Sequence, residues 1–465
     1  MEISIKNIGS IKQAKFELND FTIICGKNNT GKTYVTYATY GFLDYWHSGA
    51  AIDIDKKIIN DVMEKGSISI PIDVFAKKSD QILQTASNDY SKSIDKVFAG
   101  KKKFFEDSKF EVKVTKDKGY KTNQILFRAG SVGRSILKVS KEKNDENLII
   151  SLLVDKDSED LPPRSFLGDM ISAAVREIVF KDKVPRPFIA SAERTGSAIF
   201  QKELDFTRNR LIDLIGDKES RISSGRLLGR FKAEYPIPVR KNVDFIRDLP
   251  NIVNRESVFS SEHPGVLEKF SDIIGGEYKV TKDGEVQFIP TAKRTVKLSL
   301  VESSSAVRSL LDIGFYLRHV ARSGDILIVD EPELNLHPEN QRKVARLFAT
   351  MVNYGIKVFI TTHSDYLVKE LNTLILLNKN DDHIKEIAKR EDYKDDELLD
   401  VKRLKIYIAQ ENLIQPDGKK RKSKCQTLVE APISEQNGIE IGTFDETIEN
   451  MNRIQEELIW GVESD

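Results

Sequence analysis

The sequence predicts an α/β protein with a mixed β-sheet, flanking helices, a small antiparallel β subdomain and a helical lobe. The first observation is an apolar strand, 21–25, that is followed at once by a glycine-bearing loop and a helix. The second is a pair of apolar runs, 326–329 and 357–361, with helical spacing between them, as in strand–helix–strand folds. The third is a group of short alternating runs between 109 and 154, which is typical of antiparallel strands.

The other elements follow from the same patterns. Residues 1–24 contain two or three short strands with a turn at Gly9-Ser10, and 34–45 have the spacing of a helix. After the break at Pro162-Pro163, residues 165–180 have the apolar spacing of an amphipathic helix. We also expect mostly helical structure over 46–108, a helix-rich section over 200–275, strands over 276–300 and at 404–408, and a helix over 443–460.

These elements suggest four parts of the chain. An N-terminal lobe, 1–200, contains the phosphate loop described below together with a helical insert at about 46–108 and a β subdomain at about 109–154. A helical lobe is expected over 201–290, a C-terminal lobe of the central domain over 291–380, and a strand–hairpin–helix extension over 381–465.

Composition limits the class of protein. Among 465 residues, 72 are Lys or Arg and 72 are Asp or Glu, so the formal net charge is zero. This balance excludes a uniformly basic nucleic-acid-binding protein but allows a local basic patch. Two cysteines, Cys25 and Cys425, are too few for a disulfide framework or a four-cysteine zinc site. The start lacks the layout of a signal peptide, and no apolar run approaches the roughly 20 residues that span a bilayer. We therefore expect a cytoplasmic protein with no membrane segment.

The glycine-bearing loop has the spacing of a phosphate-binding loop, with two glycines, a lysine and a hydroxyl residue. The backbone N–H groups of such a loop surround a phosphate, and the N-terminus of the next helix favours its negative charge. Lys32 is expected to reach the β- and γ-phosphates, and Thr33 to place its hydroxyl on Mg²⁺. The expected nucleotide-binding residues are Gly26, Lys27, Asn28, Asn29, Thr30, Gly31, Lys32 and Thr33.

Two later strands end in polar residues that suit nucleotide hydrolysis. The strand 326–329 is followed by Asp330 and Glu331, the pattern of a Walker B element. Asp330 is expected to hold Mg²⁺, and Glu331 to act as the general base or to position the attacking water. The next strand ends at His363, which can hydrogen-bond the γ-phosphate or the attacking water. Because the carboxyl ends of parallel strands meet at one edge of a sheet, these residues are expected to lie together.

Together these motifs resemble the ABC-type ATPase heads of the SMC, Rad50 and RecF class, and most closely the AAA15 and OLD-like ATPases. The resemblance rests on the phosphate loop, on the run Asp-Glu-Pro-Glu-Leu-Asn-Leu-His-Pro at 330–338 and on Thr-His-Ser at 362–364. It implies an ABC ATPase head that uses ATP and Mg²⁺. In such families two heads enclose the nucleotides between them, so a homo-oligomer is implied, either a dimer of heads or a higher assembly.

The same resemblance places a signature-like segment between the phosphate loop and the Walker B strand. Ser303, Ser304 and Ser305 stand where the family keeps its signature loop, and hydroxyls at a helix N-terminus suit a γ-phosphate held by another subunit. The run lacks the glycines of the family's Leu-Ser-Gly-Gly signature, so we expect slow, regulatory hydrolysis. Arg194 lies in another segment that recurs in AAA15 proteins, where a role near the nucleotide or helical lobe competes with a lobe-bridging ion pair. No glutamine is assigned to the family's Q-loop.

The C-terminal extension leaves the choice of function open. OLD nucleases carry a metal-binding nuclease domain after the ATPase, but the nearest acidic pair here, Asp381-Asp382, has the wrong spacing, so we expect no built-in nuclease. The basic run 419–424 suits a solvated hairpin tip, or alternatively a contact with DNA or an acidic protein. The acidic stretch 395–397 shows that the neutral charge is a sum over segregated patches.

Two functional hypotheses remain. The first is an ATPase subunit of a two-component prokaryotic antiphage defence system, such as PARIS or Septu, which controls a separate effector nuclease and responds to a phage protein as a possible trigger. The second is a RecF-like repair ATPase that clamps DNA. Net charge gives no support to DNA binding, so a protein partner is favoured.

Overall fold

The computed structural model describes residues 1–115, 119–131, 134–154, 161–199, 235–417, 421–440 and 442–460. The chain forms two compact units. Unit 1 contains residues 1–4, 42–93 and 108–186, and unit 2 contains residues 5–41, 94–107 and 187–465. The expected helical lobe, 201–290, is described from residue 235 onward, and Lys419 and Lys420 of the basic run also lie outside the described residues.

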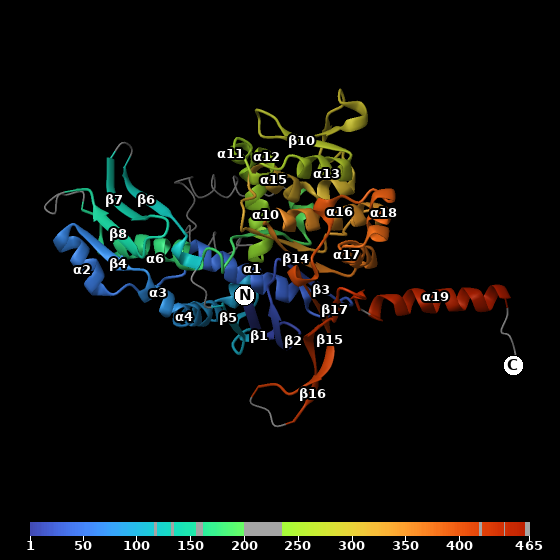
Figure 1. Cartoon of the computed structure of the whole chain (residues 1–465), viewed down its shortest axis with the longest axis horizontal. Coiled ribbons are helices and arrows are strands. Elements are labelled where there is room, and N and C mark those ends of the chain that lie inside the picture. Colours follow the sequence, from blue (N-terminus) through green and yellow to red (C-terminus); the bar gives the residue numbers. More distant parts are fainter. Residues whose placement is uncertain are drawn as a thin grey trace, which may run out of the picture. The chain divides into compact units, whose positions relative to one another are not determined.

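Unit 2 is built on a six-stranded mixed sheet (Figure 1). Its order is β16 (Ser423–Glu430), β15 (Leu404–Ile414), β3 (Phe21–Cys25), β14 (Lys357–Thr362), β13 (Ile326–Asp330) and β9 (Pro187–Ala190). All neighbouring pairs from β15 to β9 are parallel, whereas β16 is antiparallel to β15. The predicted mixed sheet is therefore confirmed.

The central strands are apolar because both faces of the sheet are covered. Every residue of β3 and β13 is buried, as expected of inner parallel strands. On one face Phe348 of α16 (Pro338–Asn353) packs edge-on against Phe21, with 6.4 Å between ring centroids. On the other face Phe16 of β2 (Ile11–Glu17) packs against Phe359 of β14 and Tyr407 of β15. The sheet thus lies inside the core of unit 2.

Strand register brings the motif-bearing strand ends to one edge of the sheet. Thr362 lies opposite Cys25, and Thr361 lies opposite Asp330. Val329 lies opposite Ala190, the last residue of β9. Because all these pairs are parallel, the loops that follow the four strands leave from the same edge.

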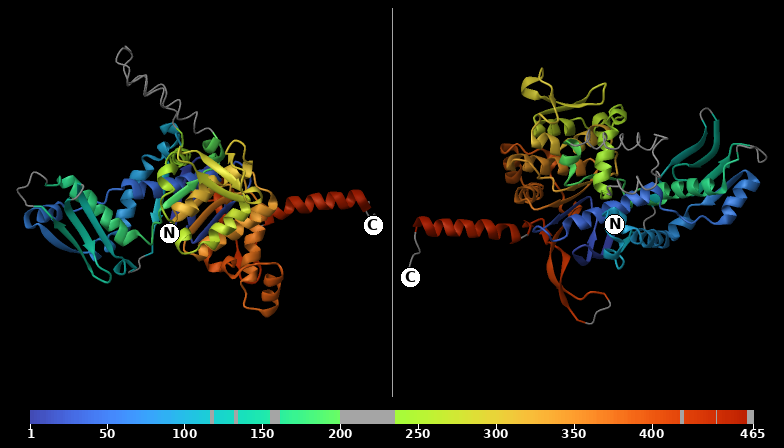
Figure 2. Two further views of the ribbon diagram at one scale, coloured as in Figure 1. Left: turned by 90° about the horizontal axis from the view of Figure 1, so that it is seen from above. Right: turned by 180° about the vertical axis from the view of Figure 1, so that it is seen from behind.

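Helices surround this sheet (Figure 2). The first, α1 (Lys32–Gly49), begins two residues before the predicted helix, and its residues from 42 onward belong to unit 1. The others in unit 2 are α5 (Ile94–Val97), α7 (Arg194–Ile199), α10 (Ile237–Arg247), α11 (Leu249–Ile252), α12 (Val258–Ser261), α13 (Gly265–Ile274), α14 (Ser305–Ser309), α15 (Leu311–His319), α16, α17 (Asp365–Leu377) and α18 (Asp382–Arg390).

Smaller sheets complete unit 2. The strands expected over 276–300 are present as an antiparallel sheet of β10 (Gly276–Val280), β11 (Val286–Pro290) and β12 (Leu298–Ser299). At the N-terminus β1 (Glu2–Ile8), whose first three residues belong to unit 1, turns at Gly9-Ser10 into β2 as predicted. The C-terminal extension contains the β15–β16 hairpin, β17 (Ile433–Ser434), β18 (Gly438–Ile439) and α19 (Gly442–Trp460).

Unit 1 has a four-stranded antiparallel sheet in the order β4 (Ser67–Pro71), β8 (Asn147–Leu152), β7 (Arg134–Lys141) and β6 (Ile125–Ser131). It also contains β5 (Lys109–Lys113) and four helices, α2 (Lys56–Lys65), α3 (Asp73–Lys77), α4 (Ser79–Ser91) and α6 (Arg164–Phe180). The last of these is the predicted amphipathic helix.

Unit 1 differs from the sequence expectation at one strand. The segment 46–108, expected to be helical, contributes β4 to the sheet, while β5 is not part of that sheet. The physical reason is local. Gly66 ends α2 in the left-handed region with φ +75°, and the following Ser-Ile-Ser-Ile alternation suits a half-buried strand.

Candidate active site

The phosphate loop joins β3 to α1 in conformations that favour glycine. Gly26 has φ +145° and Gly31 has φ +96°, and Asn29 between them has φ +63°. A Cβ atom on Gly26 would lie 2.5 Å from the backbone oxygen of Ala409 in β15, which is too close for any other residue. The loop is therefore held against the neighbouring strand in a shape that only this spacing of glycines allows.

Lys32 lies inside the curve of this loop. Its side chain is buried, and Nζ donates hydrogen bonds to the backbone oxygens of Gly26 and Lys27, both at 2.9 Å. Burial lowers the pKa of Lys32, whereas the nearby carboxylates of Glu331 and Asp330 oppose that shift. The ammonium group is thus placed where the phosphates of a bound nucleotide are expected.

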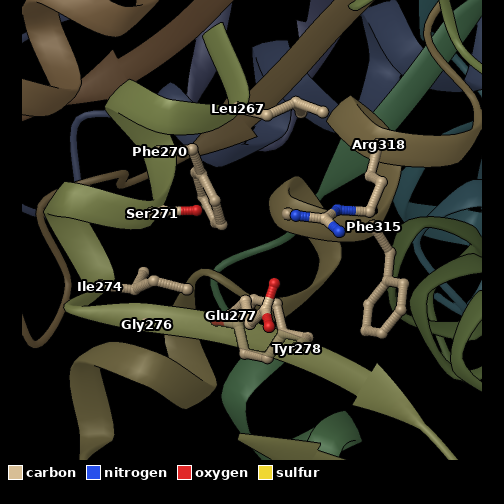
Figure 3. Close-up of a pocket in the computed structure, with 10 residues that line it drawn as sticks. Leu267, Phe270, Ser271, Ile274, Gly276, Glu277, Tyr278, Phe315 and Arg318 are labelled. Carbon is tan, nitrogen blue, oxygen red and sulfur yellow. The ribbon is translucent and has the colours of Figure 1, made fainter. Parts of the chain in front are cut away.

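An open cavity of about 490 Å³ lies next to the loop, a volume within the range of small-ligand sites. Glu331 approaches it from the Walker B strand, and Ser10 from the β1–β2 turn. The complete lining is Ser10, Asn28, Asn29, Thr30, Gly31, Lys32, Thr33, Tyr34 and Glu331. A second cavity in unit 2, between α13, β10 and α15, measures only about 10 Å³ and has room for no more than a water molecule (Figure 3).

Asp330 ends β13 in a fully buried position. The Thr361 hydroxyl donates a hydrogen bond to Oδ1, whereas Oδ2 has no hydrogen-bond partner among the described residues. Burial raises the pKa of Asp330 to about 6, and the hydroxyls of Thr361 and Thr33 oppose that rise. A buried carboxylate oxygen with a free lone pair, close to the Thr33 hydroxyl, fits a Mg²⁺ ligand.

Within the described ranges, no group of three or more His, Cys, Asp or Glu residues could hold a metal ion. Mg²⁺ sites that are completed by substrate phosphates need only one or two carboxylates, so Asp330 with Thr33 is sufficient.

Glu331 adopts an unusual backbone conformation. Its φ is +52°, in the left-handed region that costs a non-glycine residue about 1–3 kcal/mol. Its N–H donates to the backbone oxygen of Thr361 at 3.0 Å, and its side chain keeps 25% of its surface exposed at the cavity. The chain therefore turns sharply after Asp330, so that the two consecutive acids point to different environments.

His363 follows β14 and lies beside two carboxylates. Its Nδ1 is 3.2 Å from Oε1 of Glu333 and 3.7 Å from Oε1 of Glu331. Glu333 is buried, and its Oε1 also accepts hydrogen bonds from the Thr362 hydroxyl and the His363 N–H, both at 2.8 Å. Glu333 thus fixes the position of His363 through these contacts. Sequence reasoning missed this role, although Glu333 stands two residues after Glu331.

Sequence reasoning missed a second polar pair near Asp330. The hydroxyl of Tyr37, in α1, donates to Oε2 of Glu193 at 2.6 Å, and the Glu193 carboxylate contributes to the raised pKa of Asp330. The sequence does place Glu193 three residues after the apolar strand that ends at Ala190. Because β9 pairs in parallel with β13, the residues after both strands leave from the same edge of the sheet.

The three signature-like serines do not line this cavity. The Ser303 side chain is buried and donates to the backbone oxygen of Ser299 at 2.7 Å. Ser304 is the N-cap of α14 and accepts from the Val307 N–H at 3.3 Å. Ser304 and Ser305 are exposed, so they are accessible to another molecule.

Arg194 lies next to the turn that carries Asp330 and Glu331. It is buried, and its guanidinium donates four hydrogen bonds to backbone oxygens and none to a carboxylate or an open cavity, among the residues the structure describes. The opposing charge that acts most strongly on Arg194 is Asp312, which is 1% exposed and whose oxygens have no hydrogen-bond partner in the described part of the chain. Burial raises the pKa of Asp312 to about 7, although Arg194 lowers it.

Comparisons with known proteins agree with this site. The AAA_15 family, described as the AAA ATPase domain, matches residues 1–162 and 242–368, which is more than half of the chain. The chain belongs to this family of ATPases. No curated protein matches it. The matched ranges include the phosphate loop, the signature-like serines, the Walker B strand and His363.

Solved structures that the chain resembles include three SMC head domains. The SmcHead bound to the C-winged helix domain of ScpA is 12% identical with a TM-score of 0.35, over 94% of this chain and 98% of that chain. The Smc head domain with an extended coiled coil, bound to the C-terminal domain of ScpA derived from Pyrococcus furiosus, is 13% identical with a TM-score of 0.31, over 98% of both chains. The SMC head domain from Thermotoga maritima is 10% identical with a TM-score of 0.30, over 93% and 98%.

Replacing Lys32 tests the phosphate loop. Lys32→Ala removes the only side-chain ammonium within the curve of the loop, and we expect ATP affinity to fall at least about a hundredfold because charge-assisted phosphate contacts are lost. Isothermal titration with ATP and Mg²⁺ measures the change, and Lys293→Ala, whose side chain is exposed outside the loop, is the matched control. Unchanged ATP affinity in Lys32→Ala contradicts the assignment.

The buried Asp312 predicts a pH dependence of stability. Because its pKa is about 7 in the folded chain and near 3.8 in an unfolded one, the folded state binds the proton more tightly between these values. The contribution of Asp312 to the free energy of unfolding therefore falls as pH rises from about 4 to about 7. Thermal melts of the wild type and Asp312→Asn should show the variant gaining relative stability over this range. A difference that is constant with pH contradicts the prediction.

Proposed function

We propose that this protein is an ABC-type ATPase whose copies enclose ATP between them and which acts in the cytoplasm as a sensor or scaffold for a separate effector nuclease in prokaryotic antiphage defence. The observation that supports it most directly is that Lys32 and Glu331 line one cavity at the carboxyl edge of the sheet, while the buried Asp330 lies close enough for its charge to act on Lys32. Family membership supports the ATPase part. The defence part rests on the sequence resemblance to the ATPase of PARIS, AriA.

The phosphate loop and Lys32 would bind the triphosphate. Backbone N–H groups at the start of α1 and the Lys32 ammonium supply the positive charge that the β- and γ-phosphates need. Asp330 and Thr33 would hold Mg²⁺, which would supply positive charge against the charge that develops on the phosphates. The second oxygen of Asp330 is free to serve this purpose, since Thr361 occupies the first.

Glu331 and His363 would position and activate the attacking water. The Glu331 carboxylate is exposed at the cavity and stands after the Mg²⁺-binding strand, which suits a general base or a water-positioning group. His363 lies within 3.7 Å of that carboxylate and is fixed by Glu333 below it. Both side chains can therefore contact one water or one γ-phosphate oxygen.

The second copy is required because the signature-like serines lie outside the chain's own cavity. Ser304 and Ser305 are exposed at the start of α14, where they can meet a γ-phosphate bound by another copy. Slow, regulatory hydrolysis is expected because the serine run has no glycine to let the backbone approach that phosphate closely.

The Glu331→Gln variant tests both the hydrolytic and the assembly parts. Removing the carboxylate charge while keeping the side-chain shape should lower kcat at least about a hundredfold and leave ATP affinity within a few-fold. The variant should therefore stay ATP-bound and assembled, which light scattering after gel filtration with and without ATP measures. A wild-type rate in Glu331→Gln contradicts the role of this residue.

A second variant separates assembly from hydrolysis. Ser304→Glu, built on Glu331→Gln, places a negative charge at the exposed N-cap of α14 opposite the expected γ-phosphate. We expect it to bind ATP but remain a single copy, because like charges repel. Glu302→Gln, at an exposed position of the same loop, is the matched control. ATP-dependent assembly of the Ser304→Glu variant contradicts the enclosed-nucleotide arrangement.

The C-terminal helix α19 supports a protein partner over DNA. Met451, Ile454 and Leu458 on this helix are 56%, 48% and 79% exposed. Glu456 and Glu457 are exposed on the same helix, where they disfavour the phosphate backbone of DNA. Among the described residues, no helix is long and apolar enough to cross a membrane.

A RecF-like DNA-binding ATPase in DNA repair is the second candidate. It is favoured by three exposed basic residues, Arg421 and Lys422 before β16 and Lys424 within β16, although Lys424 pairs with Glu411 at 3.0 Å. Co-expression with the neighbouring gene decides between the two. The defence function predicts that a nuclease co-purifies without DNA, whereas the repair function predicts ATP-dependent DNA affinity that falls steeply with salt.

A further inference from the structure

Arg194 connects three segments that the proposed reaction uses. Its Nε donates to the backbone oxygen of Ser309 at 2.6 Å, and Nη2 donates to that of Glu331 at 3.0 Å. Its Nη1 donates to the backbone oxygens of Ser191 at 2.9 Å and Asp330 at 2.8 Å. One planar cation therefore links the end of α14, the end of β9 and the turn after β13.

The oxygens of Ser191 and Glu331 also accept backbone N–H groups, from Arg194 and Leu334, both at 3.2 Å, and the guanidinium adds a charged donor to them. Ser309 is the last residue of α14, and the final carbonyls of a helix have no partner within the helix and favour a cation. The oxygens of Asp330 and Glu331 lie where the chain leaves the sheet and turns into the left-handed conformation at Glu331. Buried carbonyls without partners are costly, so Arg194 stabilises both the helix end and the turn.

We propose that Arg194 is a positioning residue for ATP hydrolysis, which holds the Glu331 turn in its productive conformation and ties it to the segment that carries Ser304. This inference rests on the proposed function. Arg194 does not touch the cavity that would hold the nucleotide. It acts through the backbone of Glu331, whose left-handed conformation directs the carboxylate into that cavity.

The link to Ser304 is short and stiff. Only four residues, 305–308, separate the Ser304 N-cap from Ser309, whose carbonyl Arg194 binds. The next helix, α15, is fixed in turn, since a Cβ atom on Gly314 would lie 2.7 Å from the rings of both Phe270 and Tyr278. Figure 3 shows these rings, from α13 and β10, together with Phe315 of α15. A shift of the segment 303–305 would therefore displace the Ser309 carbonyl and, with it, the Arg194 guanidinium.

Asp312 explains why the position can hold a buried cation. Its carboxyl lies among the charges that act on Arg194 and is the first of them in strength. A buried charge without a counter-charge is strongly destabilising. Lysine could keep the charge but not the geometry, because its donors share one atom and cannot span three segments as the guanidinium fork does.

The test compares Arg194→Lys with Arg403→Lys. Arg403 also binds three groups, Asp20, Asn353 and the backbone oxygen of Val352, but near the amino end of β3. We expect Arg194→Lys to lower kcat for ATP at least about tenfold with ATP affinity nearly unchanged, since small displacements of catalytic groups are costly. Arg403→Lys should keep the wild-type kcat. A folded Arg194→Lys variant with kcat within about twofold of wild type overturns the proposal.

A double-mutant cycle separates positioning from a general structural effect. If Arg194 acts through Glu331, adding Arg194→Lys to Glu331→Gln should change the single-turnover rate little further. Additive losses overturn the proposal, because they show that Arg194 acts independently of Glu331.

If Arg194→Lys does not fold, the variant Arg194→Met with Asp312→Leu removes both buried charges together and restores the core. It should fold and show the same loss of kcat, and a wild-type kcat overturns the proposal.

The same assays distinguish this inference from the proposed function. A wild-type chain without ATP hydrolysis, or with hydrolysis that Lys32→Ala leaves intact, overturns the proposed function and this inference with it. Hydrolysis that depends on Lys32 and Glu331 but not on Arg194 overturns this inference alone.

Discussion

The parallel register of the central sheet is the constraint on which the site depends. β3, β14 and β13 run side by side in the same direction, and Cys25, Thr362 and Asp330 end them at one edge. The chain distance between the phosphate loop and the Walker B turn is about 300 residues, yet this register makes them neighbours. Hydrogen bonds along apolar, fully buried strands fix that register, because a slip by one residue would turn buried side chains to the wrong face.

Close approach of β15 to the phosphate loop adds a second constraint. β15 comes from the C-terminal part of the chain, pairs in parallel with β3 and places Ala409 against Gly26. The Cys25 thiol also lies 3.5 Å from the backbone oxygen of Tyr407 in the same strand. The loop is thus shaped from outside as well as by its own glycines, so the C-terminal extension contributes to the core of the ATPase and is more than an appendage.

Much of this arrangement could be predicted from the sequence because it follows local rules. The phosphate loop, the Walker B strand and the strand before His363 combine a short apolar run with polar residues at its end, and each is present where the pattern indicates. The β4 strand was missed because it is short and lies between helices, where only the Ser-Ile alternation after Gly66 marks it. Its pairing with β8, about 80 residues away, has no local signal.

The supporting residues of the site could not be predicted for a different reason. Glu333 and Arg194 act through backbone atoms, namely the His363 N–H and the oxygens of Asp330 and Glu331. Backbone groups carry no residue identity, so no pattern of side chains in the sequence records these contacts. Arginine and glutamate are also common, and alone each suggests an ion pair at the surface. Only the fold shows that both are buried, with Glu333 bound to the end of β14 and Arg194 bound to the turn after β13.

The strain at Glu331 connects these observations. A left-handed glutamate persists only where its surroundings over-determine it, and here the Thr361 oxygen holds its N–H while Arg194 holds its own oxygen. Hydrogen bonds to both the N–H and the backbone oxygen of Glu331 fix its backbone. Its side chain can therefore stay at the cavity without packing against other side chains, and it remains accessible to water. Arg194 also binds the end of α14, the helix that Ser304 caps. The conformation of Glu331 therefore depends on where that helix lies.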